Sequence, residues 1–287
     1  MAEITEYKSS LTEFAARTAQ NNYLLFNTFG MYLTDTFDGY LDTLDDSYYD
    51  KIHTRRESGI QVRRIGFDVS RVAYTMTEFI EECVVSERVA MNADPALTTE
   101  EVAVTRCVDR IMRKLHVELA SVLIISGNYT HTSSDSWATT SAIDSVRKQI
   151  NAIVNKKGIR PDTLILDSTA YNGLYKIKSD AVSVDYPLSE QLGVARIIPF
   201  DTRLQLNQPM FTKKAVLACV GDITDPEPVN KFMVPLVQRE VNFATTTYFD
   251  PSINANVVKV KLNAAIVVAD KDLAALFTGT WSTDPFA

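Results

Sequence analysis

Apolar residues recur at helical spacing through the middle of the chain. Six of them step forward by three or four positions: Val104, Val108, Ile111, Leu115, Leu119 and Val122. This spacing puts them on one stripe of a helix. Thr98 and Glu101 have the spacing of a capping box, and Gly127 is a stop signal. We predict a helix over 98–126, roughly 43 Å long. Because globular helices average about a dozen residues, this one is expected to organise the whole fold.

A second amphipathic helix and a short strand follow. The apolar stripe of this helix consists of Ile143, Val146, Ile150 and Ile153. Gly158 suits a left-handed cap, and Lys156 and Lys157 suit the negative end of the helix dipole. The apolar run Thr163–Leu166 predicts a buried strand. Asp162 and Asp167 flank that strand and could form a carboxylate pair. We favour the other interpretation, in which Asp162 belongs to a proline turn and Asp167 caps a third helix.

The last third of the chain is strand-like. Val258, Val260 and Leu262 alternate with Lys259 and Lys261, which predicts a half-buried strand with a solvated lysine face. Further strands are predicted at 195–200, 215–220, 232–236, 241–248, 257–262 and 265–268. Asp270 is expected to cap a final short helix through Leu273 and Leu276. Helices mixed with a strand-rich end indicate the α+β class.

Residues 1–34 have a weak helical pattern, which predicts an arm or a short docking helix. The charge of the chain then changes sign abruptly between the two stretches that follow. Asp35–Asp50 holds six Asp and no Lys or Arg, whereas Lys51–Arg71 holds six basic residues against two acids. The second stretch alternates loosely around a turn candidate at Glu57–Gly59, which predicts a charged hairpin. Such a hairpin is either a solvated surface loop or an extended arm whose charges meet a complementary neighbour.

Composition excludes several classes of protein. The 287 residues are 46% hydrophobic, the net charge is -7 and the pI is about 5.1. The hydrophobic content argues against a disordered chain, and the negative net charge argues against non-specific binding to nucleic acid. No apolar run is long enough to cross a bilayer, so no membrane partner is expected, and the N-terminus lacks the pattern of a signal peptide. Cys83, Cys107 and Cys219 do not have the spacing of metal ligands or of a redox motif. We therefore expect these cysteines to be small, buried hydrophobic residues of a protein in a reducing compartment.

No motif for chemistry is present. The glycine-rich phosphate loops and the nucleophile elbow are missing, and His53, His116 and His131 lack metal-ligand spacing. His116 is expected to be a structural histidine of the long helix. We therefore predict no catalytic, cofactor-binding or metal site, no cofactor and no enzyme activity, which favours a structural protein.

The order of parts resembles one family. Arm, charged hairpin, long helix, tryptophan loop, helix, strand, helix and late strands follow one another as in the major capsid proteins of tailed bacteriophages. Four segments carry the likeness: Val89–Pro95, Leu115–Ala120, Gly158–Leu166 with Tyr171 and Leu174, and Ala264–Leu276. The resemblance implies an α+β HK97-like capsid fold with an N-terminal arm, an extended E-loop hairpin, a long spine helix, and peripheral and axial domains.

The resemblance also implies a layout and an assembly. The arm would be 1–50, the E-loop 51–74, the peripheral domain 75–136 and 231–287 with spine helix 98–126, and the axial domain 137–230. Members form pentamers and hexamers that close an icosahedral head around double-stranded DNA, without sequence-specific binding. Expected partners are a separate scaffolding protein, a portal and a decoration protein, and the expected locations are the virion and, during assembly, the host cytoplasm.

The predicted hairpin carries the residues expected to contact neighbouring subunits. Arg55, Arg56, Arg63 and Arg64 would meet acidic residues of an adjacent copy, with Asp35–Asp50 as candidates. Some family members join subunits through a hairpin lysine, but the predicted tip Arg56–Gly59 has none. We therefore expect no covalent cross-linking. Two alternatives remain open: an encapsulin-like nanocompartment shell protein, which would share the fold, and a soluble α/β enzyme centred on residues 142–175.

Reversing the charge at Arg63 and Arg64 tests the predicted contact. The double change Arg63→Glu and Arg64→Glu should lower the yield of assembled particles and the salt concentration at which they dissociate. Each exposed pair contributes only about 0–1 kcal/mol, but every copy repeats it. Size-exclusion chromatography across a salt series measures both quantities, and unaltered yield and salt tolerance would reject the contact.

Overall fold

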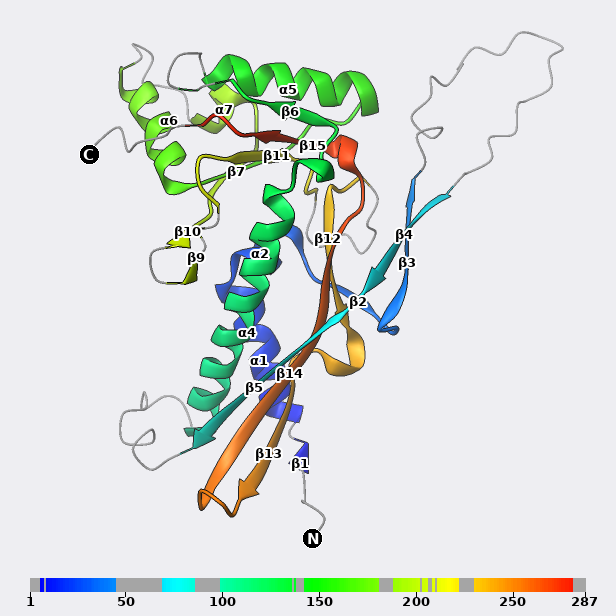
Figure 1. Ribbon diagram of the computed structural model, residues 1–287, viewed down its shortest axis with the longest axis vertical. Helices are drawn as coiled ribbons and strands as arrows, with labels where there is room; N and C mark the ends of the chain where they lie inside the picture. Colours follow the sequence, from blue (N-terminus) through cyan, green and yellow to red (C-terminus); the bar gives the residue numbers. More distant parts are fainter. Residues whose placement is uncertain are drawn as a thin grey trace, which may run out of the picture.

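A long helix joins two sheets in the computed structural model of this protein (Figure 1). The structure describes residues 6–7, 9–44, 69–85, 99–135, 137, 142–180, 188–201, 203–205, 208–209, 211–221 and 230–280. The long helix is α4 (Thr99–Ile124). The other helices are α1 (Ser9–Asn22), α2 (Leu24–Phe29), α5 (Ala142–Lys157), α6 (Ser168–Asp180) and α7 (Leu188–Leu192), with short 3-10 turns at Ser126–Asn128, Arg239–Val241 and Lys271–Leu273.

The larger sheet runs beside α4 and is built around one strand, β14 (Ala255–Val268). Its other strands are β1 (Glu6–Tyr7), β2 (Tyr32–Thr34), β5 (Thr77–Val85), β12 (Met233–Gln238) and β13 (Ala244–Asp250). β5 pairs with β14 along one edge, while β13 and β12 follow each other along the opposite edge. The two strands predicted at 257–262 and 265–268 are thus a single strand, because Asn263 continues the pairing between them.

The smaller sheet lies at the C-terminal end of α4, with α5 beside it (Figure 1). Its order is β6 (His131–Ser133), β15 (Ala274–Phe277), β11 (Ala215–Ala218), β7 (Thr163–Leu166) and β8 (Arg196–Pro199). Two further strand pairs complete the described chain: β3 (Asp38–Leu44) with β4 (Val69–Thr75), and β9 (Arg203–Gln205) with β10 (Gln208–Pro209).

Helix α4 is buried on more than one side. Five of the six residues of the predicted apolar stripe lie in the core, and Val122 packs against it partly buried. Ala103, Cys107, Met112 and Ala120, which lie off that stripe, are buried as well. The helix is covered by α1 on one side and by β5 and β14 on another. One continuous hydrophobic cluster therefore includes residues of α1, α4, the larger sheet and the smaller sheet.

The start of the chain packs as a docking helix. Leu11, Ala15 and Ala19 of α1 are buried, and α1 lies against α4. Leu25, Phe26 and Phe29 of α2 are buried in the same cluster. Of the two alternatives for residues 1–34, the docking helix is the one seen in residues 9–29.

The predicted helix after Asp270 is wrong beyond its first turn. Asp270 does cap a short turn, because its carboxylate accepts the Asp272 N–H. The chain then enters β15, which pairs with β11 and β6 and is wholly buried. The run Ala274–Phe277 is apolar at every position, and the neighbouring strands decide its conformation.

The two lysines at the end of α5 make specific ion pairs. Lys156 Nζ lies 2.6 Å from Asp272 Oδ1, and the buried Lys157 Nζ lies 3.0 Å from Asp270 Oδ2 and 3.5 Å from Asp272 Oδ2. Burial raises the pKa of Asp272, but hydrogen bonds from Lys156 and Thr130 and the two ammonium charges outweigh it, so the pKa lies below the usual value. This cluster ties α5 to the turn that precedes β15.

Removing one carboxylate of this cluster should destabilise the fold. Asp272→Asn is expected to lower the free energy of unfolding at pH 7 by about 3 kcal/mol, because it weakens the pairing of a buried ammonium. Asp42→Asn, which breaks an exposed pair with Arg71, should cost less than about 1 kcal/mol. Because the Asp272 pKa is depressed in the folded state, its contribution should be present above about pH 4 and fade as the pH falls further. Urea denaturation measures these differences, and equal losses in the two variants would contradict the assignment.

Candidate assembly surface

The root of the charged hairpin joins the acidic and basic stretches of this chain. β3 pairs with β4 in antiparallel register from Asp38 opposite Thr75 to Leu44 opposite Val69. Asp42 faces Arg71 directly, and Asp42 Oδ1 lies 3.1 Å from Arg71 Nε. The hairpin therefore begins at Asp38, earlier than the predicted 51–74. Arg55, Arg56, Arg63 and Arg64 lie outside the described residues, so their contact with a neighbour stays a prediction.

Part of the acidic run is already paired within the chain. Besides Asp42, Asp35 has Oδ1 at 2.9 Å from Nε of Arg239, at the end of β12. Both pairs are exposed on the surface. Asp35 and Asp42 thus have partners of their own, which narrows the acidic candidates for a neighbour's arginines to the rest of Asp35–Asp50.

A second, smaller core fixes the hairpin root to the larger sheet. Leu41, Val72 and Tyr74 of the hairpin pack on a separate buried cluster made of Tyr32, Met76, Val234, Leu236, Ala265, Val267 and Ala269. Tyr74 Oη lies 2.8 Å from Thr36 Oγ1 and 3.1 Å from Thr34 Oγ1. A Cβ at Gly39 would lie 2.9 Å from the same Tyr74 oxygen, so glycine makes this close approach possible.

The outer face of the larger sheet carries the predicted lysines. Lys259 Nζ lies 3.3 Å from Glu82 Oε1 of β5, and Lys261 pairs with Glu78 of the same strand. On β5, Ile80 lies between Glu78 and Glu82, and Val84 follows Glu82; these two apolar residues are 37% and 46% exposed. The lysine face therefore consists of two ion pairs with exposed apolar residues beside them.

Two apolar side chains are exposed where β13 turns into β14. Phe249 is 53% and Ile253 50% exposed, at the far end of the larger sheet from the smaller one (Figure 1). Asp250 accepts hydrogen bonds from the backbone N–H and hydroxyl of Ser252, and Asn254 has φ 48°, so the turn is well formed. Leu33, Phe37 and Tyr40 are exposed apolar residues near the hairpin root. Exposed apolar groups of this size favour protein contacts.

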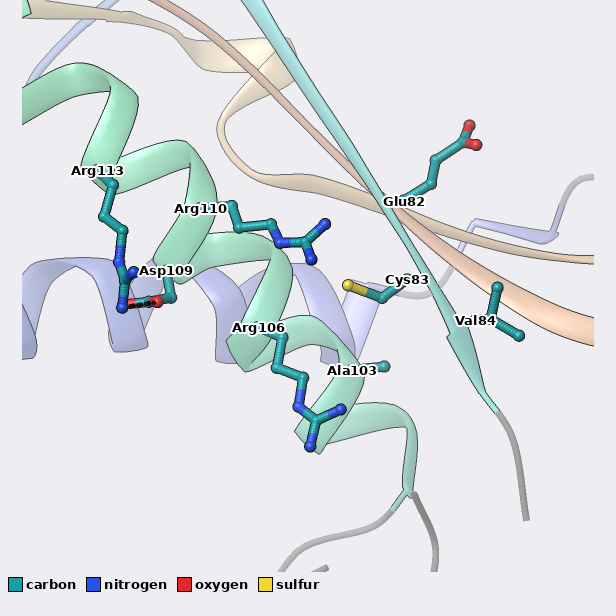
Figure 2. A pocket seen from close by; sticks show the side chains of 8 residues that line it. All are labelled: Glu82, Cys83, Val84, Ala103, Arg106, Asp109, Arg110 and Arg113. Atoms are coloured by element: carbon teal, nitrogen blue, oxygen red, sulfur yellow. Dashed lines mark ion pairs between the residues drawn. The ribbon is translucent and has the colours of Figure 1, made fainter. Parts of the chain in front are cut away.

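A basic cleft lies between α4 and β5. It measures about 480 Å³ and is lined by Cys83, by the three arginines Arg106, Arg110 and Arg113, and by the carboxylates Glu82 and Asp109 (Figure 2). Glu81 of β5 pairs with Lys114 at 2.5 Å and with Arg110 at 3.7 Å. No signal in the sequence predicts this cleft, because the arginines recur every three or four residues like any solvated helix face.

The residues considered for chemistry have structural surroundings. Asp167 accepts the Ala170 N–H at 2.9 Å and so caps α6, as predicted. Asp162 accepts the N–H groups of Val220 and Gly221 at 2.8 and 3.0 Å. Within the part of the chain that the structure describes, no three His, Cys, Asp or Glu side chains gather as metal ligands.

His116 of α4 is the most buried histidine described. Its ring lies 6.0 Å from the rings of Tyr23 and Phe200, both edge-on. Its Nε2 is buried with no hydrogen-bond partner among the described residues. Burial lowers its pKa below the usual value. These surroundings favour a neutral imidazole in contact with the two aromatic rings.

A second cleft of about 410 Å³ lies between α5 and α7. Arg147 donates to the Gln191 carbonyl at 2.9 Å, and Arg160 donates to the Gly193 carbonyl at 3.1 Å. These two hydrogen bonds tie α7 and the residue after it to α5 and to the segment that follows α5.

No helix within the described residues has both the length and the apolar character to span a membrane.

Comparison by sequence and by structure gives different results. No protein-family model matches the chain, and no curated protein matches its sequence. Solved structures do match. A phage-related protein from Bordetella bronchiseptica has a TM-score of 0.77 and 15% identity, over 97% of this chain and 98% of that one.

Two assembled shells are also similar. The procapsid of satellite phage P4, which includes a size-determination protein, matches with a TM-score of 0.55 and 8% identity, over 94% of this chain and 99% of that one. The holo-SrpI encapsulin complex from Synechococcus elongatus matches with a TM-score of 0.50 and 10% identity, over 89% and 86% of the two chains. At these identities the likeness is one of fold. The chain has the α+β HK97-like capsid fold that the order of its segments predicted.

The partly buried His116 should make stability depend on pH. Because its folded pKa is lower than the unfolded value of about 6.5, stability should be complete above that pH and fall as the pH drops toward 5. His116→Gln should reduce this loss of stability at low pH. The matched comparison is His131→Gln, at a more exposed histidine whose pKa is also lowered by burial. Urea denaturation between pH 7 and pH 5 measures the slope. A slope unchanged by His116→Gln would refute this role.

Proposed function

We propose that this chain is the major capsid protein of a tailed bacteriophage. It assembles as pentamers and hexamers into the icosahedral head that encloses double-stranded DNA. The observation that carries this proposal is the match over nearly the whole chain, 97%, to a phage-related protein, together with the match to a phage procapsid.

The distribution of unburied groups supports assembly of many copies. The exposed apolar residues at the β13–β14 turn and those at the hairpin root lie on different parts of the molecule (Figure 1). Contacts that join different patches of successive copies are heterologous, and such contacts build rings and larger closed shells. The hairpin root also has its own small core, so it can hold a long arm against a neighbour.

The charge pattern supports a container. A net charge of -7 disfavours tight general binding to phosphates, so enclosed DNA can be released. The proposed partners are further copies of the chain, a separate scaffolding protein, a portal and a decoration protein. The proposed locations are the virion and, during assembly, the host cytoplasm. The proposed layout is an N-terminal arm 1–50, of which residues 9–29 dock on the core, an E-loop 51–74 whose paired root begins at Asp38, a peripheral domain 75–136 and 231–287, and an axial domain 137–230.

Two other functions compete with this one. A nanocompartment shell is the second candidate, because an encapsulin complex shares the fold. The soluble enzyme is the weaker alternative. Its proposed centre at 142–175 supplies β7 to the buried middle of the smaller sheet, and its aspartates Asp162 and Asp167 are occupied by backbone N–H groups. We propose that the chain is not an enzyme.

Assembly of the purified chain is the first test. Full-length protein, alone and with crowding agents, should form closed shells or five- and six-membered rings in negative-stain microscopy of size-exclusion fractions. A chain that stays a monomer or dimer and melts higher with a small ligand would overturn the proposal. Particles from the native source that protect double-stranded DNA from nuclease support the phage head, whereas particles filled with protein would support the compartment.

Replacing the two exposed apolar residues of the β13–β14 turn by serine should weaken assembly without unfolding the chain. Phe249→Ser with Ile253→Ser should reduce the yield of particles, because subunit contacts bury apolar groups of this kind. Ile125→Ser, at an apolar residue 51% exposed beside the end of α4, is the matched control and should assemble normally. Circular dichroism checks that both variants keep the fold. Normal assembly of the double variant would show that this turn makes no contact.

A further inference from the structure

Two cysteines meet at the contact between the larger sheet and α4. One face of β5, which includes Phe79, Glu81 and Cys83, packs toward α4. Cys83 is opposite Val258 in the strand register, and Cys107 Sγ of α4 lies 3.9 Å from the Val258 carbonyl oxygen. The two thiols thus lie close enough for each to shift the pKa of the other. Strand register and helix packing thus bring together cysteines that are far apart in sequence.

The two thiols differ in access. Cys83 is half-buried, and its sulfur points from β5 toward α4 in the basic cleft (Figure 2). Cys107 is fully buried and does not line the cleft. A reagent in the cleft can therefore reach Cys83, whereas Cys107 is closed to it.

The cleft favours the thiolate of Cys83. Its pKa is lowered to about 7, first by the hydrogen bond from Cys107 and then, against burial, by the charges of Arg110 and Arg106. The same hydrogen bond and burial raise the pKa of Cys107. A thiolate beside a protonated thiol is the arrangement of an attacking and a resolving cysteine.

The arginines also select the reagent. Arg113 Nη2 lies 2.8 Å from Asp109 Oδ2, and Arg110 shares Glu81 with Lys114. Within the described residues, no carboxylate lies within ion-pair distance of Arg106, whose side chain lines the cleft and is exposed. A small molecule that carries carboxylates is the ligand such a cleft attracts.

We propose that Cys83 and Cys107 are a thiol–disulfide redox pair, oxidised by an anionic low-molecular-weight disulfide of the glutathione class to a bond that joins β5 to α4. The inference does not depend on the capsid function. In a shell subunit, the bond would form when the particle leaves a reducing cytoplasm for an oxidising medium.

The reaction is two exchanges. The Cys83 thiolate attacks one sulfur of the small disulfide, a mixed disulfide forms on Cys83, and the first small thiolate leaves. Cys107 gives up its proton and attacks Cys83 Sγ, the mixed disulfide breaks, and the second small thiolate leaves. The two protein thiols lose two electrons and two protons, and the small disulfide gains them to become two thiols.

The test uses the full-length chain and oxidised glutathione at neutral pH. Intact mass and thiol titration in denaturant should show two of the three free thiols lost without added glutathione mass, and peptide mapping should join Cys83 to Cys107. Cys107→Ala should stop at the mixed disulfide on Cys83. Cys83→Ser should leave both remaining cysteines reduced. Cys219→Ser, at the buried third cysteine, is the matched control and should react as the wild type does.

Two further readouts separate this role from mere exposure of a thiol. Arg106→Gln should slow the reaction with oxidised glutathione more than the reaction with neutral hydroxyethyl disulfide. The oxidised wild type should unfold at higher urea than the reduced form, and Cys107→Ala should show no such gain. Retention of all three thiols by the wild type, a wild type that stops at the mixed disulfide, or equal reactivity of Cys83→Ser would overturn the proposal.

Discussion

Burial of α4 on more than one side is the constraint on which the rest of the structure depends. A helix with a single apolar stripe needs one partner, but α4 also buries Ala103, Cys107 and Met112. It must therefore be covered by α1 as well as by β5 and β14. Its length then fixes the distance between the two sheets, because the larger sheet packs along it and the smaller sheet lies at its C-terminal end (Figure 1). The cleft that holds Cys83 arises at this same packing contact.

The local signals in the sequence predicted the elements whose form is decided locally. The long helix begins and ends within two residues of its predicted limits, and the strand Thr163–Leu166 has its predicted bounds. Gly158 has φ 71°, as its role as helix cap requires. In each case a periodic stripe, a cap or an apolar run bounded by turn residues contains the information.

Distant pairing decided what the sequence analysis missed. Ala274–Phe277 is a strand because β11 and β6 lie on its two edges. Asp38–Leu44, rich in residues that disfavour strands, is a strand because Val69–Thr75 pairs with it. Likewise, the exposure of Phe249 or the meeting of Cys83 with Cys107 depends on register, and no local pattern encodes it. The resemblance to capsid proteins supplied the global order that local signals lack.

Charged and apolar side chains have different roles on the surface of the hairpin root and the larger sheet. Several charges of the hairpin root and sheet face are paired within the chain, as Asp42–Arg71, Asp35–Arg239 and Glu82–Lys259 show. Exposed pairs of this kind contribute little energy each, but they oppose displacement of one strand against the next, because a shift would separate opposite charges. The root of the hairpin is thereby held on the larger sheet, and the β13–β14 turn is positioned by the register of its two strands. Apolar residues at such positions, Tyr40 and Phe249 among them, are presented in a set geometry. A subunit with two preorganised contact regions can join many copies with the same angle each time, which is what a closed shell requires.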